Sequence, residues 1–171
     1  MRRWLLPLLI GAIAALVGYQ LALAAAPRLL MGAAVKRVGQ AGMNRMTHGP
    51  LATDRSRAIV RPSPDLAYSS CPFDLSNGPV RVQVAPAPSV YWSLSVFDSR
   101  TDTALVRNNG ETGDQPIDIV LARPGQPTPA GREVVRVNGA KGIALVRILV
   151  QDRTGFAAID AARRRSSCAP L

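Results

Sequence analysis

The sequence predicts a mainly β fold, a β-sandwich or jelly-roll-like domain, with a transmembrane or juxtamembrane helix before it and a short helix at its C-terminus. Two observations support this fold class. One long apolar run stands near the N-terminus, and beyond Pro50 short runs of alternating apolar and polar residues are separated by Gly, Pro and Asn. A chain of 171 residues has room for one folded domain. We therefore expect three parts, comprising residues 1–26, 27–49 and 50–171.

The N-terminal run, Trp4–Ala26, predicts a membrane anchor or a signal peptide. It carries no charge, and about 20 apolar residues suffice for a helix to cross a bilayer. Arg2 and Arg3 precede the run, which favours a cytoplasmic N-terminus, an inner-membrane location and a periplasmic folded domain. The alternative is cleavage after Ala22-Leu23-Ala24, which would release the domain into the periplasm. Both interpretations export residues 50–171.

Residues 27–49 predict a juxtamembrane helix that carries the chain off the bilayer or packs on the domain. Over residues 28–46 an apolar stripe with helical spacing comprises Leu30, Ala34, Val38 and Ala41. No acidic residue occurs before residue 54, whereas the remainder is nearly balanced in charge. The basic residues placed to attract anionic lipid headgroups are Arg28, Lys36 and Arg37.

The folded part contains seven segments with strand periodicity. They are Ala58–Arg61, Val80–Val84, Tyr91–Asp98, Thr103–Asn108, Ile117–Leu121, Glu133–Val137 and Gly142–Val150. In the third segment, Trp92, Leu94 and Val96 share one face, which predicts a core face. The last segment is apolar on both faces except at Arg147, so we expect a central strand that is covered on both sides.

The C-terminal helix is predicted from Phe156, Ile159, Ala162 and Arg163, which repeat at helical spacing. The basic run of residues 163–165 falls at the end of this helix, where it opposes the helix dipole. The folded part has no other dense basic run, and aromatic residues are only 5% of the chain. Nucleic-acid binding, which needs basic patches interleaved with stacking aromatics, is therefore not expected.

The two cysteines, Cys71 and Cys168, are predicted to form a disulfide, because thiols in an oxidising compartment tend to pair. A catalytic cysteine would need a neighbouring base. The only histidine, His48, follows the predicted juxtamembrane helix and forms no recognisable motif with either cysteine. We interpret His48 as a capping or solvated residue.

Three segments together resemble one bacterial family. They are Arg61-Pro62-Ser63-Pro64-Asp65-Leu66-Ala67-Tyr68-Ser69, Asp74-Leu75-Ser76-Asn77-Gly78-Pro79 and Tyr91-Trp92-Ser93-Leu94-Ser95-Val96-Phe97-Asp98. Over residues 43–171 the chain resembles the bacterial domain of unknown function 1254, in particular its short, membrane-anchored members. The resemblance implies a β-rich domain of exported or membrane-associated proteins, often accompanied by a second β domain for which this short chain has no room. It implies no activity and no catalytic residues.

A cluster near the third predicted strand supplies the candidate ligand-binding residues, because loops at strand ends are where scaffolds expose function. These candidates are Tyr91, Trp92, Asp98, Asp102 and Arg107. The two aspartates offer a pair of carboxylates for acid and base chemistry or for weak Ca²⁺ binding. The interpretation that we favour is structural: both aspartates stabilise a β-turn and pair with Arg100 or Arg107, and the aromatic residues are core residues.

Several enzyme classes are disfavoured by missing motifs. The chain has no G-x-S-x-G, Walker A, G-x-G-x-x-G or C-x-x-C motif and no second histidine, so we assign no catalytic residue, cofactor or metal. The leading hypothesis is a membrane-anchored envelope domain that binds a membrane or envelope protein. The alternatives are a binder of a small carbohydrate or lipid-like ligand and, less favoured, a hydrolase that uses Asp98 and Asp102.

Overall fold

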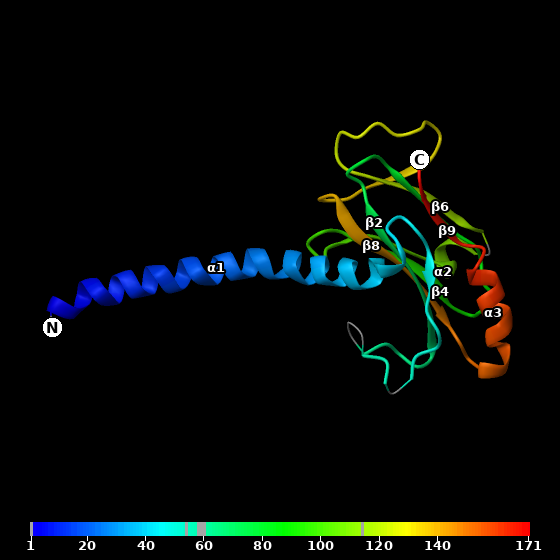
Figure 1. Ribbon diagram of the computed structural model, residues 1–171, viewed down its shortest axis with the longest axis horizontal. Helices are drawn as coiled ribbons and strands as arrows, with labels where there is room; N and C mark the ends of the chain where they lie inside the picture. Colours follow the sequence, from blue (N-terminus) through cyan, green and yellow to red (C-terminus); the bar gives the residue numbers. More distant parts are fainter. Residues whose placement is uncertain (1, 54, 58–60, 114) are drawn as a thin grey trace.

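The computed structural model describes the whole chain except residues 1, 54, 58–60 and 114. It contains one long helix, a two-sheet β domain and a short C-terminal helix, so the predicted fold class is confirmed (Figure 1). The helices are α1 (Arg2–Val38), α2 (Asn109–Thr112) and α3 (Phe156–Arg163), with single 3-10 turns at η1 (Gly39–Ala41) and η2 (Arg153–Gly155). The strands are β1 (Thr47–His48), β2 (Leu66–Asp74), β3 (Val80–Val84), β4 (Trp92–Phe97), β5 (Thr103–Asn108), β6 (Ile117–Ala122), β7 (Glu133–Arg136), β8 (Lys141–Leu149) and β9 (Ser167–Pro170).

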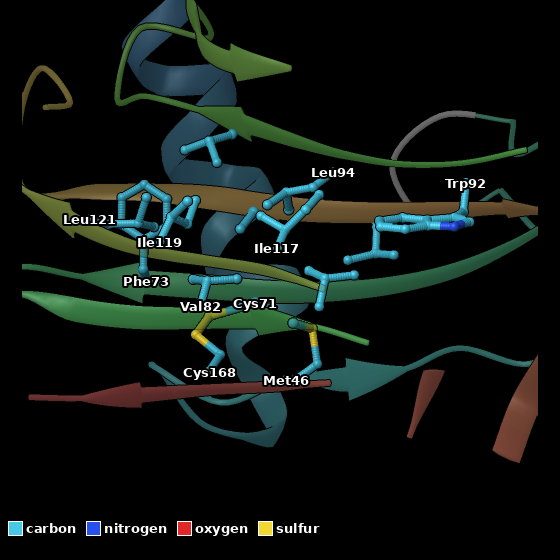
Figure 2. Packing of buried hydrophobic residues seen from close by; sticks show 14 of the residues in the cluster. Met46, Cys71, Phe73, Val82, Trp92, Leu94, Ile117, Ile119, Leu121 and Cys168 are labelled. Atoms are coloured by element: carbon cyan, nitrogen blue, oxygen red, sulfur yellow. A yellow bond between two sulfur atoms is a disulfide. The ribbon is translucent and has the colours of Figure 1, made fainter. Parts of the chain in front are cut away.

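The strands form a five-stranded sheet in the order β1-β2-β8-β4-β5 and a four-stranded sheet in the order β7-β6-β3-β9. All neighbours are antiparallel except β6 and β7, which are parallel. The sheets pack face to face, and the core between them is built from the alternate, inward-facing residues of each strand. Figure 2 shows Trp92 and Leu94 of β4 in this core with Ile119 of β6. The core face predicted for β4 is therefore confirmed.

The predicted central strand is β8, which lies between β2 and β4. One of its faces joins the core, and the other packs on α1 at Ile143 while Leu145 and Arg147 are only partly buried, so it is central as predicted but covered on the outer face only in part. Gly142 allows the chains to approach closely here, since a Cβ at this position would collide with the Phe97 carbonyl oxygen and the Phe73 ring. Six predicted strands, β3 to β8, are present within one residue of their expected bounds.

The seventh predicted strand, Ala58–Arg61, lies mostly outside the described residues, because residues 58–60 are among those omitted. Periodicity did not predict β1, β2 and β9. In β2, Pro72 and two serines interrupt the β-branched composition on which the prediction relied. Proline has no backbone N–H to donate to a neighbouring strand. Pro72 is tolerated because β1 pairs only with Ser69 and Ser70, so Pro72 lies beyond the end of the β1–β2 pairing.

Helix α1 continues without a break through Pro27, whereas the sequence suggested a separate helix over residues 28–46. The helix ends at Val38 and one 3-10 turn follows it. Gly42 then takes a φ of +118°, a conformation that glycine adopts easily and other residues rarely adopt. With 37 residues, α1 is about 55 Å long, and its N-terminal part projects away from the sandwich (Figure 1).

The C-terminal end of α1 packs on the outer face of the five-stranded sheet. Met31 and Val35 are buried there against Ile143, with Phe97 partly buried beside them. The predicted apolar stripe is wrong at Leu30, which is 67% exposed. Met31 and Val35 are buried instead, while Ala34 and Val38 of the predicted stripe pack beside them, so the packed face is only partly the predicted one.

The C-terminal segment connects the two sheets. The predicted helix is confirmed as α3, which buries Ile159, Ala162 and Arg163. After it, β9 pairs with β3, and Cys168 of β9 forms a disulfide with Cys71 of β2 in the opposite sheet (Figure 2). The predicted pairing of the two cysteines is the one found, with the Cα atoms 6.2 Å apart.

Candidate functional site

A cavity of about 460 Å³ lies between α1 and the outer face of the five-stranded sheet. Its walls are mostly apolar, with a few polar side chains. The lining residues are Met31, Ala34, Val38, Ser56, Arg61, Pro62, Tyr68, Ser70, Phe97, Ile143, Leu145 and Arg147. Most come from α1, β2 and β8, so three regular elements shape the cavity.

Strand alternation explains which side chains reach the cavity. In β8, residues 143, 145 and 147 point away from the core, and in β2 residues 68 and 70 do the same. The register pairs Tyr68 with Arg147 and Ser70 with Leu145. Helix α1 covers the end of the sheet at Ile143, whereas Arg147 stands about 13 Å further along the same strand. The cavity therefore has an apolar end at Ile143 and a polar end at Arg147.

Hydrogen bonds from other residues to both the hydroxyl and the main-chain carbonyl of Tyr68 hold this residue at the polar end. Its hydroxyl oxygen accepts a hydrogen bond from the Ser63 N–H at 2.9 Å. Its carbonyl oxygen accepts from the Gly49 N–H at 3.0 Å and from Nη1 of Arg163 at 2.7 Å. Because Arg61 is only two residues from Ser63, these bonds hold the segment that carries Arg61 beside the polar end.

The side chain of Arg163 lies in the protein interior beside the Tyr68 main chain, and the residue is only 1% exposed. It donates to the carbonyl oxygens of Tyr68 and Gly49, both at 2.7 Å, and pairs with the carboxylate of Asp160. Its guanidinium also lies over the Phe156 ring, 5.4 Å from the centroid. The sequence placed Arg163 on the helical face of Ile159 and Ala162 and explained its charge by the helix dipole; the structure adds these buried partners.

A second, polar cleft of about 340 Å³ lies between β1 and β9. It is lined by Arg45, Met46, His48, Arg164, Ser166, Ser167 and Cys168. Nδ1 of His48 is 2.8 Å from the Ser69 hydroxyl oxygen. Burial lowers the pKa of His48 below its usual value of 6.5, and the charges of Arg163 and Arg164 lower it further against the opposing effect of Asp160.

This low pKa predicts that the fold loses stability as the pH falls below 6.5. In that range the unfolded chain binds the His48 proton more readily than the folded state does, so protonation favours unfolding until the pH reaches the folded-state pKa. Above pH 6.5, urea denaturation should give a constant difference in the free energy of unfolding between wild type and His48→Gln. Below pH 6.5, the wild type should become less stable relative to the variant. An NMR titration of this single histidine at or above 6.5 would contradict the prediction.

The structure separates the candidate residues named from the sequence, and none of them lines the cavity. Trp92 is 1% exposed within the core, and its Nε1–H finds no hydrogen-bond partner among the described residues. Tyr91, which immediately precedes β4, is 40% exposed. Arg107 pairs with Glu133 of β7 at 2.5 Å and with Glu111 at 3.8 Å. Ligand binding at these residues stays a prediction.

Asp98 and Asp102 belong to a turn between β4 and β5. Asp98 is 1% exposed, and its Oδ1 accepts hydrogen bonds from the N–H groups of Arg100 and Asp102 at 2.8 and 3.1 Å. The side chain of Asp102 faces solvent and lies 3.4 Å from Nε of Arg100. Thr101 between them has a φ of +67°, which the bonds to Asp98 help to hold. This geometry gives no support to acid–base chemistry by the two carboxylates.

No three His, Cys, Asp or Glu side chains within the described part of the chain gather closely enough to hold a metal ion. The residues that sequence reasoning missed are those of the cavity, and one signal pointed to them. Arg147 is the single charged residue in the apolar segment 142–150. Charged residues are rarely buried without a partner, so Arg147 in this apolar segment indicated a polar site, which is the polar end of the cavity.

Comparison with known proteins supports the fold and identifies the family, while no functionally curated protein matches the chain. The crystal structure of the VPA0106 protein from Vibrio parahaemolyticus is similar over 85% of this chain, with 16% identity and a TM-score of 0.61. This chain covers only 37% of that protein. A putative uncharacterized protein from Burkholderia cenocepacia gives 17% identity and a TM-score of 0.45 over 84% of this chain and 38% of its own.

The family model described as protein of unknown function DUF1254 matches residues 43–170. The match covers the β domain and α3 and begins after the end of α1 at Val38. It confirms the resemblance noted in the sequence, and the chain therefore belongs to the DUF1254 family.

Proposed function

We propose that this protein is a membrane-anchored domain that binds the hydrocarbon part of a small amphiphile in the cavity beneath α1. The observation that carries this proposal is a mostly apolar cavity of about 460 Å³, one wall of which belongs to the same helix as the apolar N-terminal run. Small-molecule sites typically have volumes of about 300–1,000 Å³ and mainly apolar walls. The proposal extends the lipid-like alternative considered from the sequence.

The exposed surface of α1 supports a membrane anchor. Among the described helices, only this one is long and apolar enough to cross a bilayer. Its large apolar side chains from Trp4 to Leu23 are at least 51% exposed, all around the helix, so they need an apolar environment. We place the N-terminus in the cytoplasm, the sandwich in the periplasm, and the exposed side chains of Arg28, Lys36 and Arg37 near anionic lipid headgroups.

The anchor would place the cavity directly above the bilayer. Met31, at the apolar end of the cavity, follows Ala26 by five residues, which is about 7 Å along the helix axis. The headgroup layer on each side of a bilayer is about 5–8 Å thick. A hydrocarbon chain could therefore pass from the membrane into the cavity without crossing bulk water.

The test uses a photoreactive diazirine dodecanol with the full chain in nanodiscs, followed by mass-spectrometric mapping of the labelled peptides. We expect labels on peptides that contain Met31 and Leu145, which line the cavity. Leu145→Trp fills the cavity and should reduce this labelling at least about tenfold, as expected for the loss of well-fitting apolar contacts.

The matched control is Val106→Trp, which adds the same side chain to the same face of the sheet at a position that is 48% exposed and outside the cavity. It should leave the labelling unchanged. Equal labelling of the two variants, or labels confined to the run Trp4–Ala26, would refute binding in the cavity.

A protein partner is the second candidate, favoured by the part of the sheet face that α1 leaves uncovered. Val106 is 48% exposed on this face, and Tyr91 and Val90, which precede β4, are 40% and 62% exposed. An exposed apolar patch on a folded domain is a common feature of interaction sites. Photo-cross-linking from position 106 in native membranes would give a discrete protein adduct if a membrane or envelope partner covers this face.

A further inference from the structure

We infer that the amphiphile bound in the cavity carries an anionic head, a carboxylate or a phosphate monoester, and that Arg147 is the residue that selects it. This inference rests on the proposed function of the cavity and adds the chemical class of its ligand. Three observations support it: the unsatisfied hydrogen-bonding groups around Arg147, the lack of a carboxylate partner among the described residues, and the placement of polar groups at one end of the cavity.

The guanidinium of Arg147 is only partly satisfied by the protein. Its Nη2 donates to the Ser95 hydroxyl oxygen at 3.0 Å. Its Nε is buried and has no hydrogen-bond partner among the described residues. Ser93, which is paired with Arg147 in the β4–β8 register, also has a buried hydroxyl oxygen without a partner. Buried polar groups are normally hydrogen-bonded, so these two exceptions leave the guanidinium short of partners, and Nη1, which also has no partner among the described residues, is the donor left for a ligand in the cavity.

Within the described part of the chain, the charge of Arg147 has no carboxylate partner. The ion pairs that the structure describes lie elsewhere on the sandwich, and none of them includes this residue. A half-buried guanidinium is unfavourable without a counter-charge, whereas an anion held by a planar fork of N–H donors forms strong, charge-assisted bonds. A ligand with a carboxylate or phosphate would supply this counter-charge.

The polar groups are placed where the head of a single-chain amphiphile would lie. Arg147 and Tyr68 face each other across the β2–β8 ladder, and Arg61 lines the same cavity. The opposite end contains Ile143 and Phe97, about 13 Å away along the strand. Two arginines at one end and hydrocarbon at the other match an anionic head and an apolar tail.

The experiment compares two photoreactive probes of equal chain length, diazirine dodecanoate and diazirine dodecanol, on the full chain in phosphatidylcholine nanodiscs. The ratio of carboxylate to alcohol labelling is compared between proteins, so the different partitioning of the probes into the bilayer cancels. We expect Arg147→Gln to lower this ratio about tenfold, as for the loss of one charge-assisted pair. Labelling by the alcohol should remain as in the wild type.

The control variant is Arg153→Gln, which removes the same charge from an exposed position outside the cavity and should keep the wild-type ratio. An unchanged ratio in Arg147→Gln overturns the inference, while continued alcohol labelling of the cavity leaves the proposed function intact. Absence of cavity labelling by both probes in the wild type refutes the proposed function itself.

A competition on the wild type decides the question if Arg147→Gln does not fold. Dodecyl phosphate and dodecyltrimethylammonium, both below their micelle concentrations, are added against the alcohol probe. The phosphate should compete at least about tenfold more strongly, because only its head can pair with Arg147. Equal competition by the two heads overturns the inference.

Discussion

Replacement of both cysteines, Cys71→Ala together with Cys168→Ala, is expected to lower the free energy of unfolding by about 4 kcal/mol. The bond closes a loop between residues 97 positions apart, so its removal restores a large amount of conformational freedom to the unfolded chain. It also connects β2 of one sheet to β9 of the other. The measurement is denaturant unfolding followed by Trp92 fluorescence in a Trp4→Phe background, since the chain has two tryptophans.

A reductant provides the control for this prediction. Reduction of the wild type should shift its unfolding midpoint towards that of the double variant, whereas the variant itself should not respond to reductant. A wild-type midpoint that is identical with and without reductant would show that the two sheets do not depend on this bond for stability.

Arg163→Met is the second substitution with a large expected effect, a loss of about 3–5 kcal/mol in the free energy of unfolding. Methionine keeps much of the side-chain volume and removes the donors. The carbonyl oxygens of Tyr68 and Gly49 would lose their 2.7 Å bonds to the guanidinium, and Asp160 would lose its buried partner. Chemical denaturation of the full chain, compared with wild type, gives the value.

Arg164→Met is the matched control because Arg164 binds the same carboxylate from outside. Its Nε lies 2.6 Å from Asp160, but its side chain is 59% exposed, so solvent screens the pair. We expect a loss below about 1 kcal/mol. Equal losses in the two variants would mean that the buried contacts of Arg163 contribute little.

Much of the fold was predictable because local patterns agreed with the tertiary structure. Strands β3 and β4 alternate apolar and polar residues, β8 is apolar except at Lys141 and Arg147, and turn residues such as Asn138-Gly139 separate the strands. Strand β2 was not predicted because its pairing with β8 and its burial compensate for Pro72 and for two serines. Such compensation comes from contacts distant in sequence, which periodicity does not report.

The site was less predictable, for a related reason. The sequence drew attention to Asp98 and Trp92, whose side chains support the turn and fill the core. The cavity instead depends on how α1 lies across the sheet, and no local pattern specifies that placement. Only Arg147, a charge in an apolar strand, signalled the site. Helical spacing placed Arg163 on the face of α3 that is buried, but it could not show the carbonyl oxygens of Tyr68 and Gly49 that its guanidinium binds.

The unbroken passage of α1 through Pro27 would have a mechanical consequence in the proposed membrane-anchored state. Its apolar run Trp4–Ala26 is about 35 Å long, which exceeds a hydrocarbon core of about 30 Å, so as an anchor the helix would tilt to fit the bilayer. Because the same rigid helix packs on the sandwich through Met31 and Val35, the sandwich must tilt with it. A thinner membrane would incline the domain further, so the angle of the cavity relative to the lipid surface would vary with bilayer thickness.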